Sequence, residues 1–185
     1  RPASSPRSAS RSTRSGWGEP VITRHDVEAA RDRIAGRVRH TPLLAGDGPL
    51  GREGWFKLEH LQHTGSFKAR GAFNRILSAA EEGVLDPRVG IVVASGGNAG
   101  LANAFAARAL GVPATVFVPE NAPPVKVEKL RGYGAEVVLR GSEYAAAYEA
   151  AVEHAKGTGA VYSHAYDQPA ITAGAGTLAL EVLED

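Results

Sequence analysis

The sequence contains no cysteine among its 185 residues, which excludes disulfide bonds and metal centres with cysteine ligands. Aromatic residues make up only 6% of the chain, and no apolar run approaches the roughly 20 residues that a membrane span needs. The net charge is only +1, so charge gives no reason to expect nucleic acid or an acidic membrane as a partner. With 43% hydrophobic and 22% charged residues, the composition is typical of a soluble globular protein.

Methionine is also absent, even at position 1, so we expect the chain to be processed or truncated at its start. Residues 1–18 hold four arginines, six serines and no acidic residue, and such a segment buries too little apolar surface to offset the entropy of ordering. We therefore predict a disordered Arg/Ser-rich tail over residues 1–20. An organelle transit peptide is the alternative, although the prolines and the missing apolar face speak against it.

Helical and strand patterns follow one another from residue 21 onward. Between residues 89 and 165, short apolar strands alternate strictly with helices, which is typical of a parallel, doubly wound α/β sheet with helices on both faces. We predict turns at 46–54, strands at 55–59, 89–94, 114–118, 136–139 and 160–163, and helices at 23–36, 66–82, 98–110, 123–131, 142–156 and 169–184.

Lysine is scarce, since five lysines stand against sixteen arginines among the 21 basic residues. Lys68 follows Ser66, a good helix N-cap, and we place it in the first turn of a helix, where the positive end of the helix dipole disfavours an ammonium group. A lysine that loses its proton can attack a carbonyl, whereas arginine stays charged. Lys68 is therefore a candidate Schiff-base lysine. The simpler alternative is an exposed first-turn lysine.

A second candidate site directly follows a predicted strand. Ser95-Gly96-Gly97-Asn98 opens the next helix, and ligands of open parallel sheets bind beyond the carboxyl ends of the strands. Gly96 and Gly97 let the backbone approach a ligand closely. We expect free amide groups at Gly97, Asn98 and Ala99 to form an anion site. On this segment alone, a tight turn capped by Ser95 or Asn98 is the simpler interpretation.

Three segments together resemble the fold-type II pyridoxal-phosphate (PLP) enzymes, and most closely the serine/threonine ammonia-lyases, or threonine dehydratases. They are residues 57–72, which include Thr64-Gly65-Ser66-Phe67-Lys68, residues 94–100 and residues 166–181. The resemblance implies a tryptophan synthase β-like fold with a small domain inserted in a large one. Residues 21–88 would begin the large PLP domain, residues 89–165 would form the small α/β domain, and residues 166–185 would start the return to the large domain.

The resemblance also implies the chemistry. Lys68 would bind the aldehyde of PLP and remove the α-proton of L-threonine or L-serine; the β-hydroxyl would then leave, and a 2-oxo acid and ammonia would be released. Phe67 would pack beside the cofactor, and Asn98 would bind the 3′-oxygen of its ring. The loop Ser95-Gly96-Gly97-Asn98-Ala99 would hold the carboxylate of this small amino-acid substrate. We further expect a cytoplasmic homodimer without a metal.

The chain departs from the family pattern in two ways. Ammonia-lyases and serine racemases often carry Ser-Ser-Gly-Asn-His-Gly in this loop, whereas this chain has Gly96 for the second serine and Ala99 for the histidine. Two-base racemisation is therefore not expected, and the choice of substrate stays open. The family's glycine-rich phosphate loop would come after Asp185, so we expect about the first half of an enzyme. The strand near Trp55 and the helix from Pro169 would then lack partners.

Other interpretations remain open. A PLP-dependent β-replacement or threonine-synthase-like enzyme, or a non-catalytic PLP-fold fragment, would share these motifs. Residues 174–179 match the dinucleotide fingerprint G-x-G-x-x-A, but the strand that this motif needs is not predicted directly before them. His60 and His63 lack a third ligand nearby, so we interpret them as loop histidines rather than as a metal site.

Overall fold

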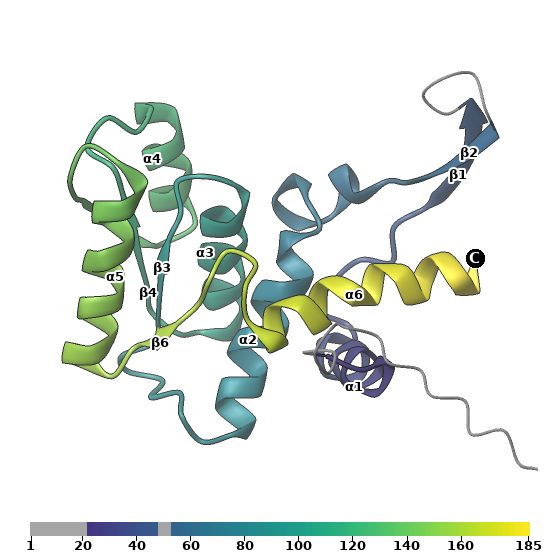
Figure 1. Cartoon of the computed structure of the whole chain (residues 1–185), viewed down its shortest axis with the longest axis horizontal. Coiled ribbons are helices and arrows are strands. Elements are labelled where there is room, and N and C mark those ends of the chain that lie inside the picture. Colours follow the sequence, from purple (N-terminus) through teal and green to yellow (C-terminus); the bar gives the residue numbers. More distant parts are fainter. Residues whose placement is uncertain (1–21, 48–52) are drawn as a thin grey trace, which may run out of the picture.

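The structure, a computed structural model, describes residues 22–47 and 53–185. The predicted disordered tail, residues 1–20, lies outside the described residues. Figure 1 shows a sheet with its helices at one end of the molecule, and a layer of three helices with a β-hairpin at the other.

The larger sheet is parallel, as the sequence predicts. Its strands are β3 (Ile91–Ala94), β4 (Ala114–Val118), β5 (Glu136–Leu139) and β6 (Val161–Tyr162), in the order β5-β4-β3-β6. All three pairings in this sheet are parallel, so each connection must cross back over the sheet. The crossovers are α3 (Asn98–Leu110), α4 (Pro124–Gly132) and α5 (Tyr144–Thr158). The predicted strands and helices of this region are confirmed, with ends shifted by one or two residues.

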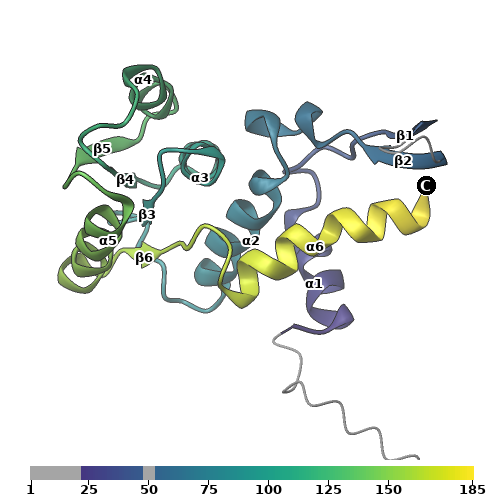
Figure 2. The same ribbon diagram turned by 45° about the horizontal axis from the view of Figure 1, so that its top comes forward.

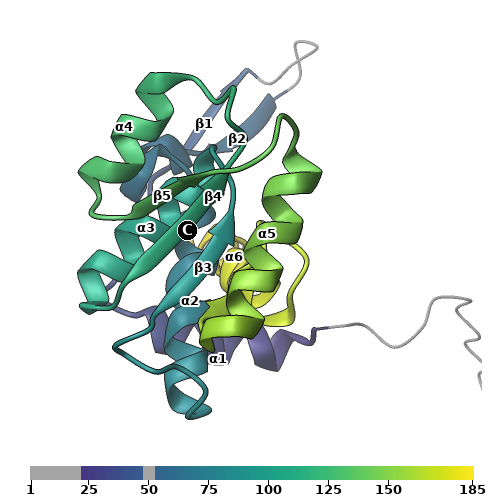
Figure 3. The ribbon, with the colours of Figure 1, turned by 90° about the vertical axis from the view of Figure 1, so that its left-hand side faces the viewer.

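Helices cover both faces of this sheet. Figure 3 shows α5 on one face and α3 with α4 on the other. Because successive strand residues point to opposite faces, Val92 packs with Ala147 and Ala151 of α5, whereas Val93 packs in the cluster that contains Leu130 of α4. Burial on both sides explains why β3 is apolar at every position.

Three helices form the second layer: α1 (Arg24–Ile34), α2 (Lys68–Glu81) and α6 (Pro169–Glu184). The predicted start of α1 is confirmed, because Thr23 and Asp26 form a reciprocal capping box. Figure 2 shows α6 crossing α2 and α1, and both contact it. The expectation that the helix from Pro169 lacks partners is therefore wrong. Across the described ranges, no helix has the length and apolar character needed to cross a membrane.

Glycines allow α2 and α6 to cross closely. A Cβ atom added at Gly174 would lie 2.7 Å from the carbonyl oxygen of Arg70 and 2.8 Å from Cα of Gly71. A Cβ at Gly176 would lie 3.0 Å from Val27 of α1. Both glycines of the formal G-x-G-x-x-A match thus lie inside one helix and serve helix packing. The strand–turn–helix that a dinucleotide site needs is missing at this place.

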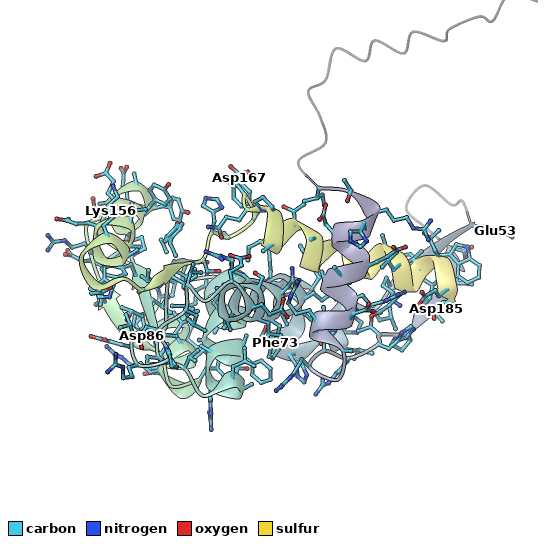
Figure 4. All side chains as sticks on the ribbon, turned by 90° about the horizontal axis from the view of Figure 1, so that it is seen from below. Glu53, Phe73, Asp86, Lys156, Asp167 and Asp185 are labelled. Atoms are coloured by element: carbon cyan, nitrogen blue, oxygen red, sulfur yellow. The ribbon has the colours of Figure 1, made fainter. Side chains whose placement is uncertain are left out.

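A buried ion cluster ties α2 and α6 to the segment before them. Arg70 is 0% exposed and donates to Glu181 at 2.6 Å and to Glu59 at 2.8 Å. Lys57 lies 3.0 Å from Glu181 and 2.8 Å from Asp185, which Figure 4 places at the far end of α6. Burial disfavours a charge on Glu181, but hydrogen bonds from Arg70 and Lys57 outweigh this and lower its pKa.

The remaining strands form a hairpin that the sequence only partly predicts. β1 (Leu43–Asp47) pairs antiparallel with β2 (Glu53–Lys57), so residues 46–47 and 53–54 belong to strands and not to the predicted turn. The strand near Trp55 therefore has a partner, contrary to expectation, although Trp55 itself is 69% exposed. Two short 3-10 helices, η1 (Glu59–Leu61) and η2 (His63–Gly65), lead on to α2.

Candidate active site

Lys68 is the first residue of α2, so its predicted place in the first helical turn is confirmed. The predicted cap is wrong: Phe67 occupies the N-cap position without a side-chain cap, and the buried Ser66 hydroxyl has no hydrogen-bond partner in the described part of the chain. Thr64 and Gly65 have φ values of 62° and 76°, and this left-handed turn leads the chain into the helix. Turn geometry, and not a serine cap, therefore positions Lys68.

A cavity of about 220 Å³ opens beside Lys68. Four parts of the fold form its wall: the start of α2, the first turns of α3, the loop after β6, and the first turns of α6. The wall residues are Phe67, Lys68, Gly71, Ala72, Ala99, Asn103, His164, Ala165, Tyr166, Ile171, Thr172 and Ala175. Most are small or apolar, so a few polar groups determine what the cavity can bind.

The Lys68 amine is held by a neutral partner. Its Nζ donates to the carbonyl oxygen of Ala165 at 2.9 Å and lies 4.9 Å from the ring centroid of Phe67. Within the described residues it has no carboxylate partner, whereas Lys57 binds two carboxylates. Lys68 can therefore turn to a ligand without breaking an ion pair.

The loop after β3 adjoins this cavity through Ala99. Ser95, Gly96, Gly97 and Asn98 are not part of the cavity wall, and Asn98 is exposed at the first turn of α3. The amide of Gly97 donates to the Ser95 hydroxyl at 3.2 Å, so the expectation of a free amide at Gly97 is wrong. The amide groups at the helix start, at Asn98 and Ala99, have no partner within the helix by its geometry.

The two loop glycines leave space open. A Cβ at Gly97 would meet only the Ser95 hydroxyl, at 3.9 Å, and a Cβ at Gly96 would touch Val118 at an ordinary 3.4 Å. At Gly100, in contrast, a Cβ would overlap the carbonyl oxygen of Ser95. Gly100 is thus required by the turn itself, while the space beside Gly97 is available to a ligand.

Sequence reasoning missed four polar residues of the cavity: Asn103, His164, Tyr166 and Thr172. His164 and Tyr166 come shortly after β6. Because ligands bind beyond the carboxyl ends of parallel strands, their position in the sequence could have identified them as site residues. Asn103 lies within an alanine-rich helix, and no local pattern marks it. Its place in the site depends on how α3 packs against α2.

His164 has a defined hydrogen-bonding state. Its Nδ1 accepts from the backbone amides of Tyr166 at 3.2 Å and Asp167 at 2.8 Å. Figure 4 places Asp167 in the loop that leads into α6. Because an accepting Nδ1 carries no proton, the neutral ring is protonated at Nε2. His164 therefore presents an N–H donor at Nε2, and its ring packs edge-on against Tyr166 with centroids 4.7 Å apart.

His60 and His63, which we considered as metal ligands from the sequence, are not part of the cavity wall. His63 stacks on Phe105 of α3 with ring centroids 4.6 Å apart, and burial followed by the charge of Arg39 lowers its pKa. His60 is exposed in η1. Residues 22–47 and 53–185 contain no group of three His, Cys, Asp or Glu side chains placed to hold a metal ion. His63 thus acts as a packing residue.

Known proteins are similar to this chain over most of its length. The model of the family described as "Pyridoxal-phosphate dependent enzyme" matches residues 34–185. The chain is 45% identical over 162 residues to an L-threonine ammonia-lyase of Geobacter sulfurreducens, covering 86% of this chain and 40% of that protein. The chain thus spans less than half the length of this relative.

Two solved structures share the fold. A threonine deaminase from T.th. is 42% identical with a TM-score of 0.78, over 88% of this chain and 51% of that one. A pyridoxal 5'-phosphate-dependent aspartate racemase is 40% identical with a TM-score of 0.79, over 88% and 51% of the two chains. Similar folds thus accompany both deamination and racemisation among these relatives, and the side chains of the site must discriminate between them.

Proposed function

The chain belongs to the family of pyridoxal-phosphate dependent enzymes and has their fold-type II α/β architecture. We propose that it forms part of a serine/threonine ammonia-lyase. The reaction is the β-elimination of L-threonine or L-serine to a 2-oxo acid and ammonia. The observation that carries the proposal is the Lys68 amine, which lies at a small cavity with a carbonyl as its partner and no carboxylate among the described residues.

The residues around the cavity fit PLP. Lys68 has the amine that would hold the cofactor aldehyde, and Phe67 lies beside that amine. Asn98, exposed at the start of α3 outside the cavity wall, would bind the 3′-oxygen. The open space at Gly97 and the amides of Asn98 and Ala99 suit an anionic group. Bound PLP supplies an electron sink for the carbanion that forms at the α-carbon.

The roles of the chain's own residues follow from this arrangement. The loop from Ser95 to Ala99 binds the substrate carboxylate and fixes the α-carbon near Lys68. Lys68 removes the α-proton and holds it on Nζ. Gly96 offers no side chain that could deliver a proton from the opposite face, so the site favours elimination over two-base racemisation.

Two alternatives make different predictions. A β-replacement or threonine-synthase-like enzyme would need a second substrate to form product. A non-catalytic PLP-fold protein would form no 2-oxo acid at all. No contact in the described residues favours either alternative over elimination.

The test is to incubate the PLP-loaded enzyme with L-threonine alone and to assay 2-oxobutanoate. We expect product without any added nucleophile, and none from a Lys68→Ala variant. Lys126→Ala is the matched control, because Lys126 is an exposed lysine of α4 and should leave activity unchanged. Product that forms only with an added nucleophile would support β-replacement, and no product would support the non-catalytic alternative.

Assembly, location and domain division remain predictions. A homodimer of the complete enzyme is tested by sedimentation, and a cytoplasmic location by fractionation of the source cells. The division at residues 88 and 165 is supported by the parallel sheet between these positions. It predicts that limited proteolysis cuts at these two boundaries before it cuts within the sheet.

A further inference from the structure

Asn103 is the polar residue of the cavity whose role is unexplained. It lies in α3, is 2% exposed and lines the cavity beside Lys68. Its Nδ2 donates to the carbonyl oxygen of Ala99 at 2.9 Å, but its Oδ1 has no hydrogen-bond partner in the described residues. Buried amide oxygens are nearly always hydrogen-bonded, so this oxygen lacks a donor that a ligand could supply.

The orientation of this amide is determined by its neighbour. A backbone carbonyl can only accept, so the NH₂ group of Asn103 must face Ala99, and the oxygen must face away from it. A flipped amide would place two oxygens against each other and leave the NH₂ group without a partner. Oδ1 is therefore an acceptor and not a donor.

The other polar side chains of the wall have protein partners or, like Tyr166, are exposed. Lys68 Nζ donates to the carbonyl of Ala165, and the Thr172 hydroxyl donates to the carbonyl of Tyr166 at 3.2 Å. His164 Nδ1 accepts two backbone amides and leaves only a donor at Nε2. Among the side-chain oxygens of the described wall, Asn103 Oδ1 is thus the one that is buried and has no hydrogen-bond donor.

Ala99 and Asn103 lie on the same side of α3 and both line the cavity beside Lys68. Asn103 lies four residues after Ala99, which corresponds to about 6 Å along the helix axis. A substrate whose carboxylate lay at the start of α3 would place its side chain in the cavity that Lys68 and Asn103 both line.

We propose that Asn103 is a specificity-determining residue that accepts a hydrogen bond from the side-chain hydroxyl of the substrate. This inference rests on the proposed function and specifies its substrate class. An amino acid with a β-hydroxyl supplies the donor, whereas an aliphatic amino acid of the same size leaves the buried oxygen unpaired. Sites with buried polar groups reject such analogues strongly for this reason.

The first test compares two substrates that both yield pyruvate. L-Serine has a β-hydroxyl donor, whereas β-chloro-L-alanine has a leaving group without a hydrogen. In the PLP-loaded enzyme, Asn103→Leu keeps the size and removes the acceptor. We expect kcat/KM for serine to fall by about tenfold or more, and that for β-chloroalanine to change by less than about twofold. An equal loss for both substrates would overturn the proposal.

The second test measures binding without turnover. In a Lys68→Ala background, calorimetry compares L-threonine with L-2-aminobutanoate, which lacks only the hydroxyl. We expect threonine to bind about tenfold more tightly, and the preference to disappear with Asn103→Leu. An unchanged preference would overturn the proposal. An enzyme that deaminates none of these compounds would instead refute the proposed function, while the binding ratio would still decide the role of Asn103.

Thermal unfolding separates the ligand role from a structural one. If Oδ1 has no protein partner, Asn103→Leu removes a buried unpaired oxygen and loses only the Nδ2 hydrogen bond to Ala99, so the melting temperature should change little. A large drop would mean that the oxygen is bonded within the protein, and that it is not free to receive a substrate.

Discussion

Replacing Gly174 with alanine tests the close crossing of α2 and α6. The added Cβ would lie 2.7 Å from the Arg70 carbonyl oxygen and 2.8 Å from both Cβ of Asn74 and Cα of Gly71. Overpacking a tight core costs about 1–3 kcal/mol, and three short contacts, two of them with backbone atoms, put this site in the upper part of that range. Alanine regains about 0.5–1 kcal/mol of helix propensity. We therefore expect a net loss of about 1–2 kcal/mol in the free energy of unfolding.

Gly157→Ala is the matched control for this prediction. Gly157 also lies inside a helix, α5, but a Cβ there would meet nothing within 4 Å. The same substitution should therefore stabilise the protein by about 0.5 kcal/mol through helix propensity alone. Urea unfolding followed by circular dichroism measures both variants. The close helix crossing would be refuted if both substitutions changed the free energy of unfolding in the same direction, or if Gly174→Ala left it unchanged.

The ion cluster gives two further predictions. Arg70→Met removes the buried cation from Glu59 and leaves Glu181 with Lys57 alone, and it should cost about 3–5 kcal/mol in urea unfolding. Arg24→Ala breaks only the exposed pair with Glu28 and should have no measurable effect; similar losses would contradict the role of burial. Because the pKa of Glu181 is lowered in the folded state, its contribution to stability is present above its ordinary pKa of 4.5 and is lost as pH falls through the lowered value. The unfolding free energy of the Glu181→Gln variant should then depend less on pH below about 4.5 than that of the unaltered protein. The same pH dependence in both proteins would argue against the hydrogen bonds from Arg70 and Lys57 to Glu181.

Local and periodic signals predicted much of the fold. The capping box at Thr23 and Asp26 lies within one helical turn, so sequence alone located the start of α1. The strict alternation after residue 89 determined the parallel sheet. The β1–β2 hairpin was missed because its glycines and charges are typical of turns, and only the pairing of residues 46–47 with 53–54 makes them strands.

Site residues could be predicted where neighbouring residues in the sequence indicate their role. Lys68 stood out because lysine is rare in this chain, and its position at a helix start was predicted correctly although the Ser66 cap behind that prediction is absent. The Ser66 cap failed because the left-handed turn at Thr64 and Gly65 sets the chain direction instead. The place of Asn103 in the cavity could not be predicted from the sequence. It depends on the packing of α3 against α2, which leaves the Asn103 side-chain oxygen unpaired among the described residues.

We infer that the amine of Lys68 carries the cofactor. The decisive experiment is to incubate the protein with PLP, reduce it with borohydride and map the modified peptide by mass spectrometry. We expect one pyridoxyl group on Lys68, and none on Lys57, which its two carboxylate partners hold as an ammonium. A pyridoxyl group on another lysine, or no adduct at all, would contradict the account.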